Sequence, residues 1–151
     1  MKKLIFVGLA LIMLLCVGFL SACGENKDQK DVFKSFISGL NACYKDGFKD
    51  EDCENVALAF GVKDSNVYKS HLAILKGLKD DANKKDITIK LTIIGYSEWE
   101  VSGNSAQATI KVRVEETEKG KTKTDTEETK VKFKKVNDVW YIDVITFTFY
   151  D

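Results

Sequence analysis

The sequence has no proline and only one histidine, His71, among its 151 residues. A single histidine cannot form a histidine cluster for metal binding or provide a second imidazole for acid–base exchange. The chain also lacks an excess of basic charge, because its 23 lysine and arginine residues match 23 acidic residues. A nucleic-acid-binding protein needs a basic face that displaces counterions from phosphates. We therefore expect no metal, no cofactor and no nucleic-acid partner.

The longest hydrophobic run lies at the amino terminus, at residues 4–20. Two lysines precede this run, and two small residues, Ser21 and Ala22, follow it. A positive start, an apolar middle and small residues at the end are typical of a secretory signal peptide. A retained transmembrane anchor is the alternative, since a run of 17 residues is at the short end of the range that spans a bilayer.

The end of this run resembles a known processing site. Leu20, Ser21, Ala22 and Cys23 resemble the lipobox of bacterial lipoproteins, in which a branched apolar residue and two small residues precede a cysteine. The resemblance implies that the Cys23 sulfur carries a diacylglyceryl group and that the signal peptide is cleaved between Ala22 and Cys23. Each buried methylene contributes about 0.8 kcal/mol, so two or more acyl chains hold a protein at a membrane. We expect a lipid-anchored protein on the extracytoplasmic face of the cell membrane.

Three segments follow from this interpretation: a signal peptide at 1–22, a flexible tether at 23–30 and a single domain at 31–151. The tether is expected because the stretch GENKDQKD has no apolar residue. A composition of 44% hydrophobic and 30% charged residues suits one small globular domain with an appendage.

Two of the four cysteines remain for the domain, because Cys16 lies in the signal peptide and Cys23 carries the lipid. Cys43 and Cys53 bracket the polar stretch YKDGFKDED, and an extracytoplasmic compartment lets such a pair oxidise. We predict a disulfide between Cys43 and Cys53, with two free thiols as the alternative. A redox pair is usually spaced Cys-x-x-Cys and a zinc site needs four ligands, so neither is expected here.

Apolar residues recur every three or four positions in three stretches of the domain, which predicts amphipathic helices. The first stretch runs from Asp31 to Cys43, the second is the short NVALAF before Gly61, and the third follows a cap at Asp64 or Ser65. The single histidine lies on the apolar side of the third stretch. We interpret it as a packed core histidine, with a catalytic group as the alternative.

After residue 86 the apolar period changes to two, which predicts strands. The alternation starts at ITIKLTI, bends near Gly95, and turns at SGNS, at EKGK and at Asn137 and Asp138. The polar stretch TKTDTEETK is interpreted as a solvated ribbon that protects an edge, with a partner-binding strip as the alternative. Apolar residues at both parities predict that the last strand lies mid-sheet or under helices. Three helices and a four-stranded antiparallel meander make an α+β fold.

The stretches VSGNSAQATIKVRVE and DVWYIDV carry a second resemblance. Their order around a polar hairpin is similar to that in the nuclear-transport-factor-2-like or cystatin-like group of small bacterial lipoproteins. This resemblance covers 31–151 and implies a curved, cone-like antiparallel sheet that wraps around the helices and leaves a pocket. The chain departs from the commoner layout of the group because no β-hairpin is predicted between its helices.

Six side chains could line such a pocket. They are His71, Tyr96, Trp99, Trp140, Tyr141 and Asp143. An enzyme of ketosteroid-isomerase-like type would use a carboxylate base beside hydrogen-bond donors, in an apolar cone that raises the carboxyl pKa. We nevertheless expect no catalytic residue, because the sequence shows no nucleophile elbow, phosphate loop or metal cluster, and fold analogy alone does not establish a reaction.

The functional prediction is a non-catalytic binding or scaffold module that is attached to the membrane through lipid on Cys23. Its partner is expected to be a protein, a peptide or a small ligand. An inhibitor or immunity protein of the cell envelope is the first alternative, and the small-pocket enzyme is the less favoured one.

Overall fold

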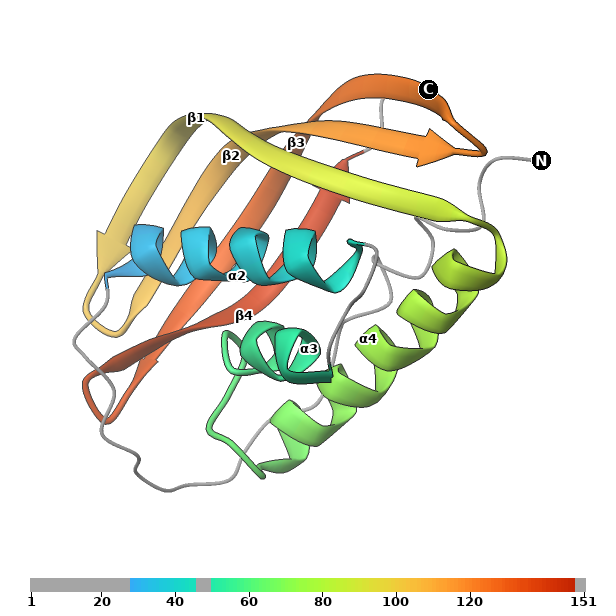
Figure 1. Ribbon diagram of the computed structural model, residues 1–151. Coiled ribbons are helices and arrows are strands. Elements are labelled where there is room, and N and C mark those ends of the chain that lie inside the picture. Colours follow the sequence, from blue (N-terminus) through green and yellow to red (C-terminus); the bar gives the residue numbers. More distant parts are fainter. Residues whose placement is uncertain (1–27, 46–49, 149–151) are drawn as a thin grey trace.

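The computed structural model describes residues 28–45 and 50–148 as three helices followed by four strands (Figure 1). The helices are α2 (Gln29–Cys43), α3 (Asp50–Ala57) and α4 (Asn66–Lys84). The strands are β1 (Ile87–Ser102), β2 (Ser105–Glu118), β3 (Lys121–Val136) and β4 (Val139–Thr148). Within the described ranges, no helix is both long enough and apolar enough to cross a membrane. The predicted signal peptide, Cys23 and the first part of the tether lie outside the described residues.

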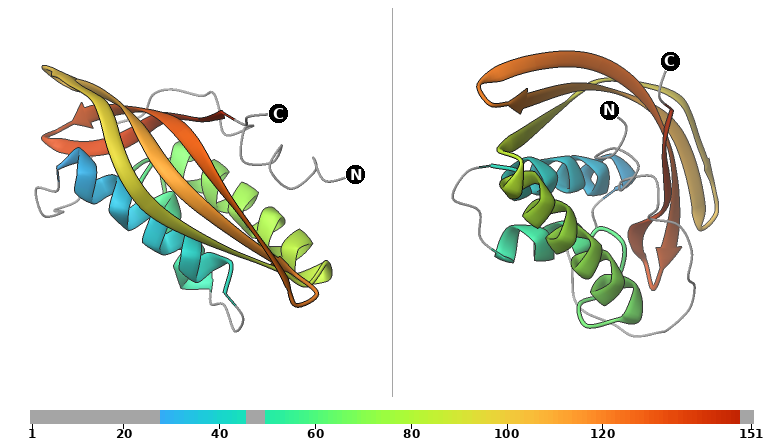
Figure 2. Two further views of the ribbon diagram at one scale, coloured as in Figure 1. Left: turned by 90° about the horizontal axis from the view of Figure 1, so that it is seen from above. Right: turned by 90° about the vertical axis from the view of Figure 1, so that its right-hand side faces the viewer.

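The four strands form one antiparallel sheet in the order β1-β2-β3-β4, so each strand pairs with its neighbour in sequence. Figure 2 shows that the sheet curves around the three helices, which all lie on its concave side. This arrangement confirms the predicted α+β fold with helices packed on a curved four-stranded sheet.

Helix α2 begins at Gln29, two residues before the predicted start, because Asp28 caps it. The Asp28 carboxylate accepts a hydrogen bond from the Asp31 backbone N–H at 2.9 Å, which satisfies one of the free donors of the first turn. Phe33 and Phe36 on this helix are no more than 1% exposed, so its apolar face lies in the core. The last two residues of the predicted tether are therefore helical.

Helix α3 differs from its prediction. The expected helix was the apolar stretch 55–60, whereas the observed one begins at Asp50 and ends at Ala57. Three acidic residues in its first turn favour the earlier start, because negative charge is stabilised at the positive end of the helix dipole. The chain then turns through hydrogen bonds that span three residues, from Ala59 N–H to Val56 O and from Phe60 N–H to Ala57 O.

Helix α4 starts at the cap expected from the sequence. The Ser65 hydroxyl oxygen accepts a hydrogen bond from the Tyr68 N–H at 3.2 Å. Tyr68, Leu75 and Ala82 are the buried residues of this helix, which lies along the outer side of α3 (Figure 1).

The core fills the space between α2 and the concave face of the sheet. Alternate residues of the two central strands point inward, and Ile110, Val112 and Val131 are at most 1% exposed. Strand β4 is an edge strand of the sheet, so the predicted mid-sheet position is wrong. Ile142 and Ile145 are nevertheless buried under the helices, which is the second position that the sequence allowed.

Strand β1 carries the predicted irregularity. Its register against β2 shifts between Ile93 and Gly95 and again between Ser97 and Glu100. Its outer edge is tied to α2 by Asn41, whose Oδ1 accepts from Leu91 N–H at 2.6 Å and whose Nδ2 donates to Leu91 O at 2.8 Å. A side chain that pairs with edge groups in this way protects the strand from unwanted pairing.

Candidate functional site

The first group of predicted pocket residues lies on β1. The Tyr96 and Trp99 rings meet edge to face with their centroids 5.7 Å apart. The Lys30 ammonium lies 5.5 Å from the Tyr96 ring centroid and 5.3 Å from that of Trp99, within the range of cation–π attraction. Trp99 also packs against the buried Phe133 ring, with the two ring centroids 5.8 Å apart. These residues form an aromatic cluster where α2 begins.

The second group lies on α4 and β4. The His71 ring stacks on Phe60 with centroids 4.0 Å apart, and its Nδ1 donates a hydrogen bond to Val67 O at 2.8 Å. Burial, and to a smaller extent the positive charge of Lys134, lowers the pKa of His71. Asp143 is exposed and forms an ion pair with Lys134 at 2.8 Å. His71 is therefore half-buried, stacked on Phe60 and hydrogen-bonded within its own helix.

Trp140 and Tyr141 open strand β4. The Lys135 ammonium lies 6.0 Å from the Trp140 ring centroid. Tyr141 is half-buried, and this burial raises the pKa of its hydroxyl. Both residues lie near the β3–β4 turn and not opposite Tyr96.

The two groups do not form one pocket. Strands β1 and β4 are the two edges of the sheet, and three strand spacings put them about 14 Å apart. The Asp143 carboxylate is paired with lysine at the surface, whereas the hydroxyl of Tyr96 lies on the opposite edge strand. A carboxylate base and hydrogen-bond donors aimed at one substrate atom are therefore not assembled from the predicted residues. Within the described ranges, no three potential ligands lie close enough to hold a metal ion.

The cysteine pair does come together. Cys43 ends α2 and Cys53 lies in α3, and their sulfurs are 2.8 Å apart, buried and present as thiols. The hydrogen bond between them lowers the pKa of Cys53 and raises that of Cys43, and burial raises the latter further. The first proton therefore leaves more readily than the second, because the remaining S–H stabilises the thiolate. The disulfide itself stays a prediction.

Two buried polar side chains on β3 are not predicted from the sequence. Glu127 and Thr129 are 6% and 0% exposed, and within the described part of the chain Glu127 Oε2 and Thr129 Oγ1 have no hydrogen-bond partner. Burial, and then the charge of Asp125, raises the pKa of Glu127 to about 7. Both share a strand face with Val131 and Phe133, and continuing that alternation backwards would have placed them inside. The polar stretch is therefore not solvated throughout.

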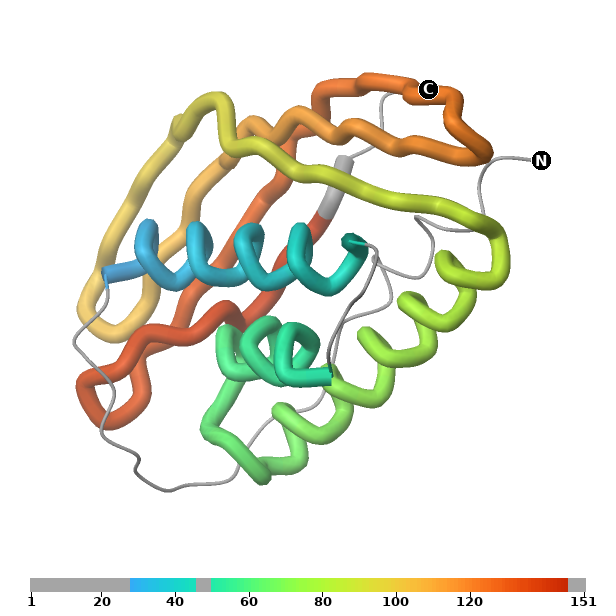
Figure 3. Tube along the Cα trace, viewed as in Figure 1, coloured from blue at the N-terminus to red at the C-terminus, as the bar shows by residue number. Residues whose placement is uncertain are grey.

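The first part of that polar stretch, residues 122–126, is exposed and within the described residues pairs on one side only. Strand β3 pairs with β4 from Glu128 onward, whereas its pairing with β2 extends back to Lys121. Within the described residues, the segment 121–127 is consequently a free edge. The tube in Figure 3 shows this part of β3 running beside β2.

The free edge is defined by the backbone of alternate residues. The Thr126 N–H donates to its neighbour's carboxylate, Asp125 Oδ1, at 2.8 Å, which indicates that this N–H points away from β2. Because successive residues of a strand direct their N–H and C=O groups to opposite edges, Thr122 and Thr124 also point away from β2. The edge therefore offers main-chain donors and acceptors to another strand.

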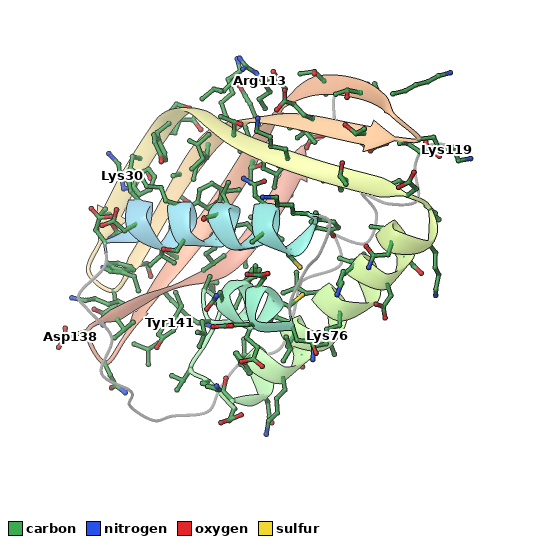
Figure 4. All side chains as sticks on the ribbon, viewed as in Figure 1. Lys30, Lys76, Arg113, Lys119, Asp138 and Tyr141 are labelled. Carbon is green, nitrogen blue, oxygen red and sulfur yellow. The ribbon has the colours of Figure 1, made fainter. Side chains whose placement is uncertain are left out.

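The aromatic cluster and the free edge lie at opposite ends of the molecule. Lys30 and Asp138 mark one end, and Lys119, in the β2–β3 turn, marks the other (Figure 4). The 14 residues of β2 connect the two ends over about 46 Å of extended chain.

No protein-family model matches the sequence, and no curated protein matches it. Several solved structures share its fold. The intermembrane-space region of the chloroplast protein ARC6 is similar with a TM-score of 0.56 at 11% identity, over 85% of this chain and 100% of that one. An NTF2-like protein with a cystatin-like fold from Novosphingobium aromaticivorans has a TM-score of 0.57 at 12% identity, over 81% of this chain and 82% of that one. An NTF2-like protein from Prochlorococcus marinus has a TM-score of 0.51 at 17% identity, over 83% of this chain and 95% of that one.

Similarity at such low identities establishes the fold and leaves the activity open. The chain thus has the NTF2-like, cystatin-like α+β fold that the sequence stretches in β1, β2 and β4 resembled.

Proposed function

We propose that this protein is a non-catalytic binding module, attached by lipid on Cys23 to the extracytoplasmic face of the cell membrane. The apolar run at 4–20 and the quartet that ends at Cys23 support the anchor. In this proposal the partner is a protein or peptide segment in extended conformation, and it binds along the free edge of β3.

The observation that carries the proposal is that residues 121–127 pair on one side only within the described part of the chain. An extended peptide can add a strand to such an edge, with main-chain hydrogen bonds for affinity and alternate side chains for specificity. Lys121, Lys123 and Asp125 are exposed on this segment, so a partner strand with charges of both signs fits it best. The same charges discourage unspecific edge pairing between copies of the chain.

The interior of the sheet favours binding at an edge over binding in a cone. Phe33, Phe36 and Leu40 from α2 occupy the concave side and are at most 1% exposed. The residues predicted to line a pocket are divided between the two edge strands and α4. A module that uses its exposed ribbon needs neither a pocket nor an assembled catalytic group.

The proposal is tested with a substitution that removes one edge donor. Thr124→Pro eliminates an N–H that points away from β2, and proline is tolerated on an edge strand when the lost N–H is not part of the ladder. Thr124→Val keeps the N–H and serves as the matched control. Crosslinking in intact cells, followed by purification of the full chain, measures the captured partner.

We expect the Pro variant to lose the crosslinked partner at an unchanged level of membrane-bound protein, and the Val variant to keep it. Equal capture by both variants would rule out pairing at this edge. A captured toxin or hydrolase would identify the module as the inhibitor or immunity protein that was the first alternative.

A further inference from the structure

Apolar and aromatic side chains gather at the end of the sheet where α2 begins. Val101 is 55% exposed, Tyr96 37% and Val136 36%, although each is large and hydrophobic. Together with the half-buried tryptophans and a lysine, they form what we call the anchor-end patch, which consists of Lys30, Tyr96, Trp99, Val101, Val136 and Trp140.

The two parts of the patch are held together by the backbone. The Lys135 N–H donates to Asn104 O at 2.7 Å, which joins the β3–β4 turn to the β1–β2 turn. Lys30, at the start of α2, lies over the Tyr96 and Trp99 rings of β1. The patch therefore lies at one end of the sheet, with residues from α2, β1, the end of β3 and the start of β4.

The acidic side chains at this end are turned away or paired. Glu98 Oε2 accepts from the Thr109 hydroxyl and Glu100 Oε2 accepts from Gln107 Nε2, each at 2.7 Å on strand β2. Asp138 forms an ion pair with a lysine at 3.2 Å, as Asp31 does at 3.6 Å. Asp28 accepts a hydrogen bond from Asp31 N–H. Within the described residues, these contacts leave the rings and the Lys30 ammonium as the unopposed groups of the patch.

The short chain between Cys23 and α2 limits how far the anchor-end patch can lie from a lipid on Cys23. Four residues lie between Cys23 and Asp28, and the five Cα-to-Cα steps of a fully extended chain span at most about 18 Å. A lipid on Cys23 therefore keeps the start of α2 close to the bilayer. The 14 residues of β2 lead away from this end over about 46 Å of extended chain, so the β2–β3 turn lies at the end remote from the bilayer.

We propose that the anchor-end patch docks on the lipid bilayer, with Tyr96, Trp99 and Trp140 at the headgroup level and Val101 and Val136 against the acyl chains. Tryptophan and tyrosine prefer this interface because one end of the ring system is apolar and the other is polar. Lysine extends its ammonium to the headgroups along an apolar stem. The inference rests on the proposed lipid anchor, and it directs the free edge of β3 away from the membrane.

The test uses tryptophan fluorescence, because Trp99 and Trp140 are the two tryptophans of the sequence. The full chain is expressed with its own signal, purified, and reconstituted into phosphatidylcholine vesicles with plain or brominated acyl chains. Bromine quenches tryptophans that lie at the acyl boundary. We expect emission to fall about twofold in brominated vesicles, as suits rings placed at the interface.

A double variant, Tyr96→Ser with Val101→Ser, should lose most of this quenching while remaining folded, because both side chains are exposed. The control is Ile74→Ser, which changes an exposed apolar residue on α4 and should leave quenching unchanged. Mass spectrometry of the same samples reports the lipid on Cys23. Lipidated protein without quenching would overturn the docking and leave the anchor intact, whereas protein without lipid would overturn both.

Discussion

At the scale of single residues, Glu127 is a buried carboxyl group that was not predicted from the sequence, and it makes the stability of the fold depend on pH. Its side chain is buried opposite Val112 with one carboxyl oxygen unpartnered in the described region, and burial, followed by the charge of Asp125, raises its pKa from the ordinary 4.5 to about 7. Because the folded-state pKa is above the unfolded value, the folded protein holds the proton more tightly. The free energy of unfolding therefore falls as the pH rises from about 4.5 to about 7, and it then levels off.

The first prediction concerns this dependence. In the wild-type protein, the free energy of unfolding should fall by up to about 3 kcal/mol between pH 4.5 and 8 because of Glu127. The Glu127→Gln variant should not show this fall. Denaturant titrations at several pH values measure it, and the variant should be the more stable protein at pH 8. Glu118→Gln, at the exposed ribbon tip, is the control and should keep the wild-type profile. Parallel pH profiles for wild type and Glu127→Gln would contradict the account.

The second prediction concerns Cys43 and Cys53. Their buried sulfurs are 2.8 Å apart, so exported protein is expected to contain them as a disulfide. When the protein is unfolded without reductant and then alkylated, its mass should show that neither Cys43 nor Cys53 has taken up the alkylating reagent. Reduction should lower the free energy of unfolding by about 3 kcal/mol through the regained chain entropy of the loop. Alkylation of both sulfurs in the unreduced sample would show that the thiols are free.

At the scale of elements, the contact between α2 and α3 depends on a glycine. A Cβ added at Gly39 would lie 2.7 Å from Val56 Cγ2 on α3, which is closer than side chains pack. A Cβ added at Gly77, in the middle of α4, would meet nothing within 4 Å. Substitution of glycine by alanine should therefore destabilise the protein at Gly39 and stabilise it at Gly77.

The third prediction follows from this pair. Gly39→Ala should lower the free energy of unfolding by about 1–3 kcal/mol, because it overpacks the helix contact. Gly77→Ala should raise it by about 0.5–1 kcal/mol, because alanine restricts the unfolded chain and favours the helix. Thermal or denaturant unfolding of both variants provides the comparison. A stabilised Gly39→Ala protein would mean that the two helices do not pack as described.

Element type was predictable from the sequence where one face of an element is apolar. The period of three to four indicated α2 and α4, and the alternation of β1 and β2 indicated strands in the correct order. The start of α3 was not predictable from apolar periodicity, because acidic residues at its first turn favour it by charge. Glu127 and Thr129 were missed because tertiary packing buries them in a segment whose composition resembles a solvated ribbon.

At the scale of the whole molecule, the fold was predictable and the site was not. Distant stretches of sequence do not report that Tyr96 and Asp143 lie on opposite edges of the sheet, since that depends on strand order. The proximity of Lys30 to the β1 aromatic rings likewise depends on where α2 crosses the sheet. Three of the predicted pocket residues, Tyr96, Trp99 and Trp140, instead belong to the anchor-end patch. At the opposite end of the molecule, β3 has an edge that is unpaired within the described residues.

The fourth prediction concerns the anchor. Cells grown with a labelled fatty acid should incorporate label into the native chain and into Cys16→Ala, but not into Cys23→Ala. The Cys23→Ala protein should also be released from the membrane fraction, because no acyl chain holds it there. Labelling of Cys23→Ala at the native level would place the fatty acid on another residue.

The intact mass of the native protein purified from membranes tests the central claim most directly. The account predicts a chain that begins at Cys23 and carries a diacylglyceryl group on that sulfur. A mass that retains residues 1–22, or one that includes no fatty acid, would contradict it.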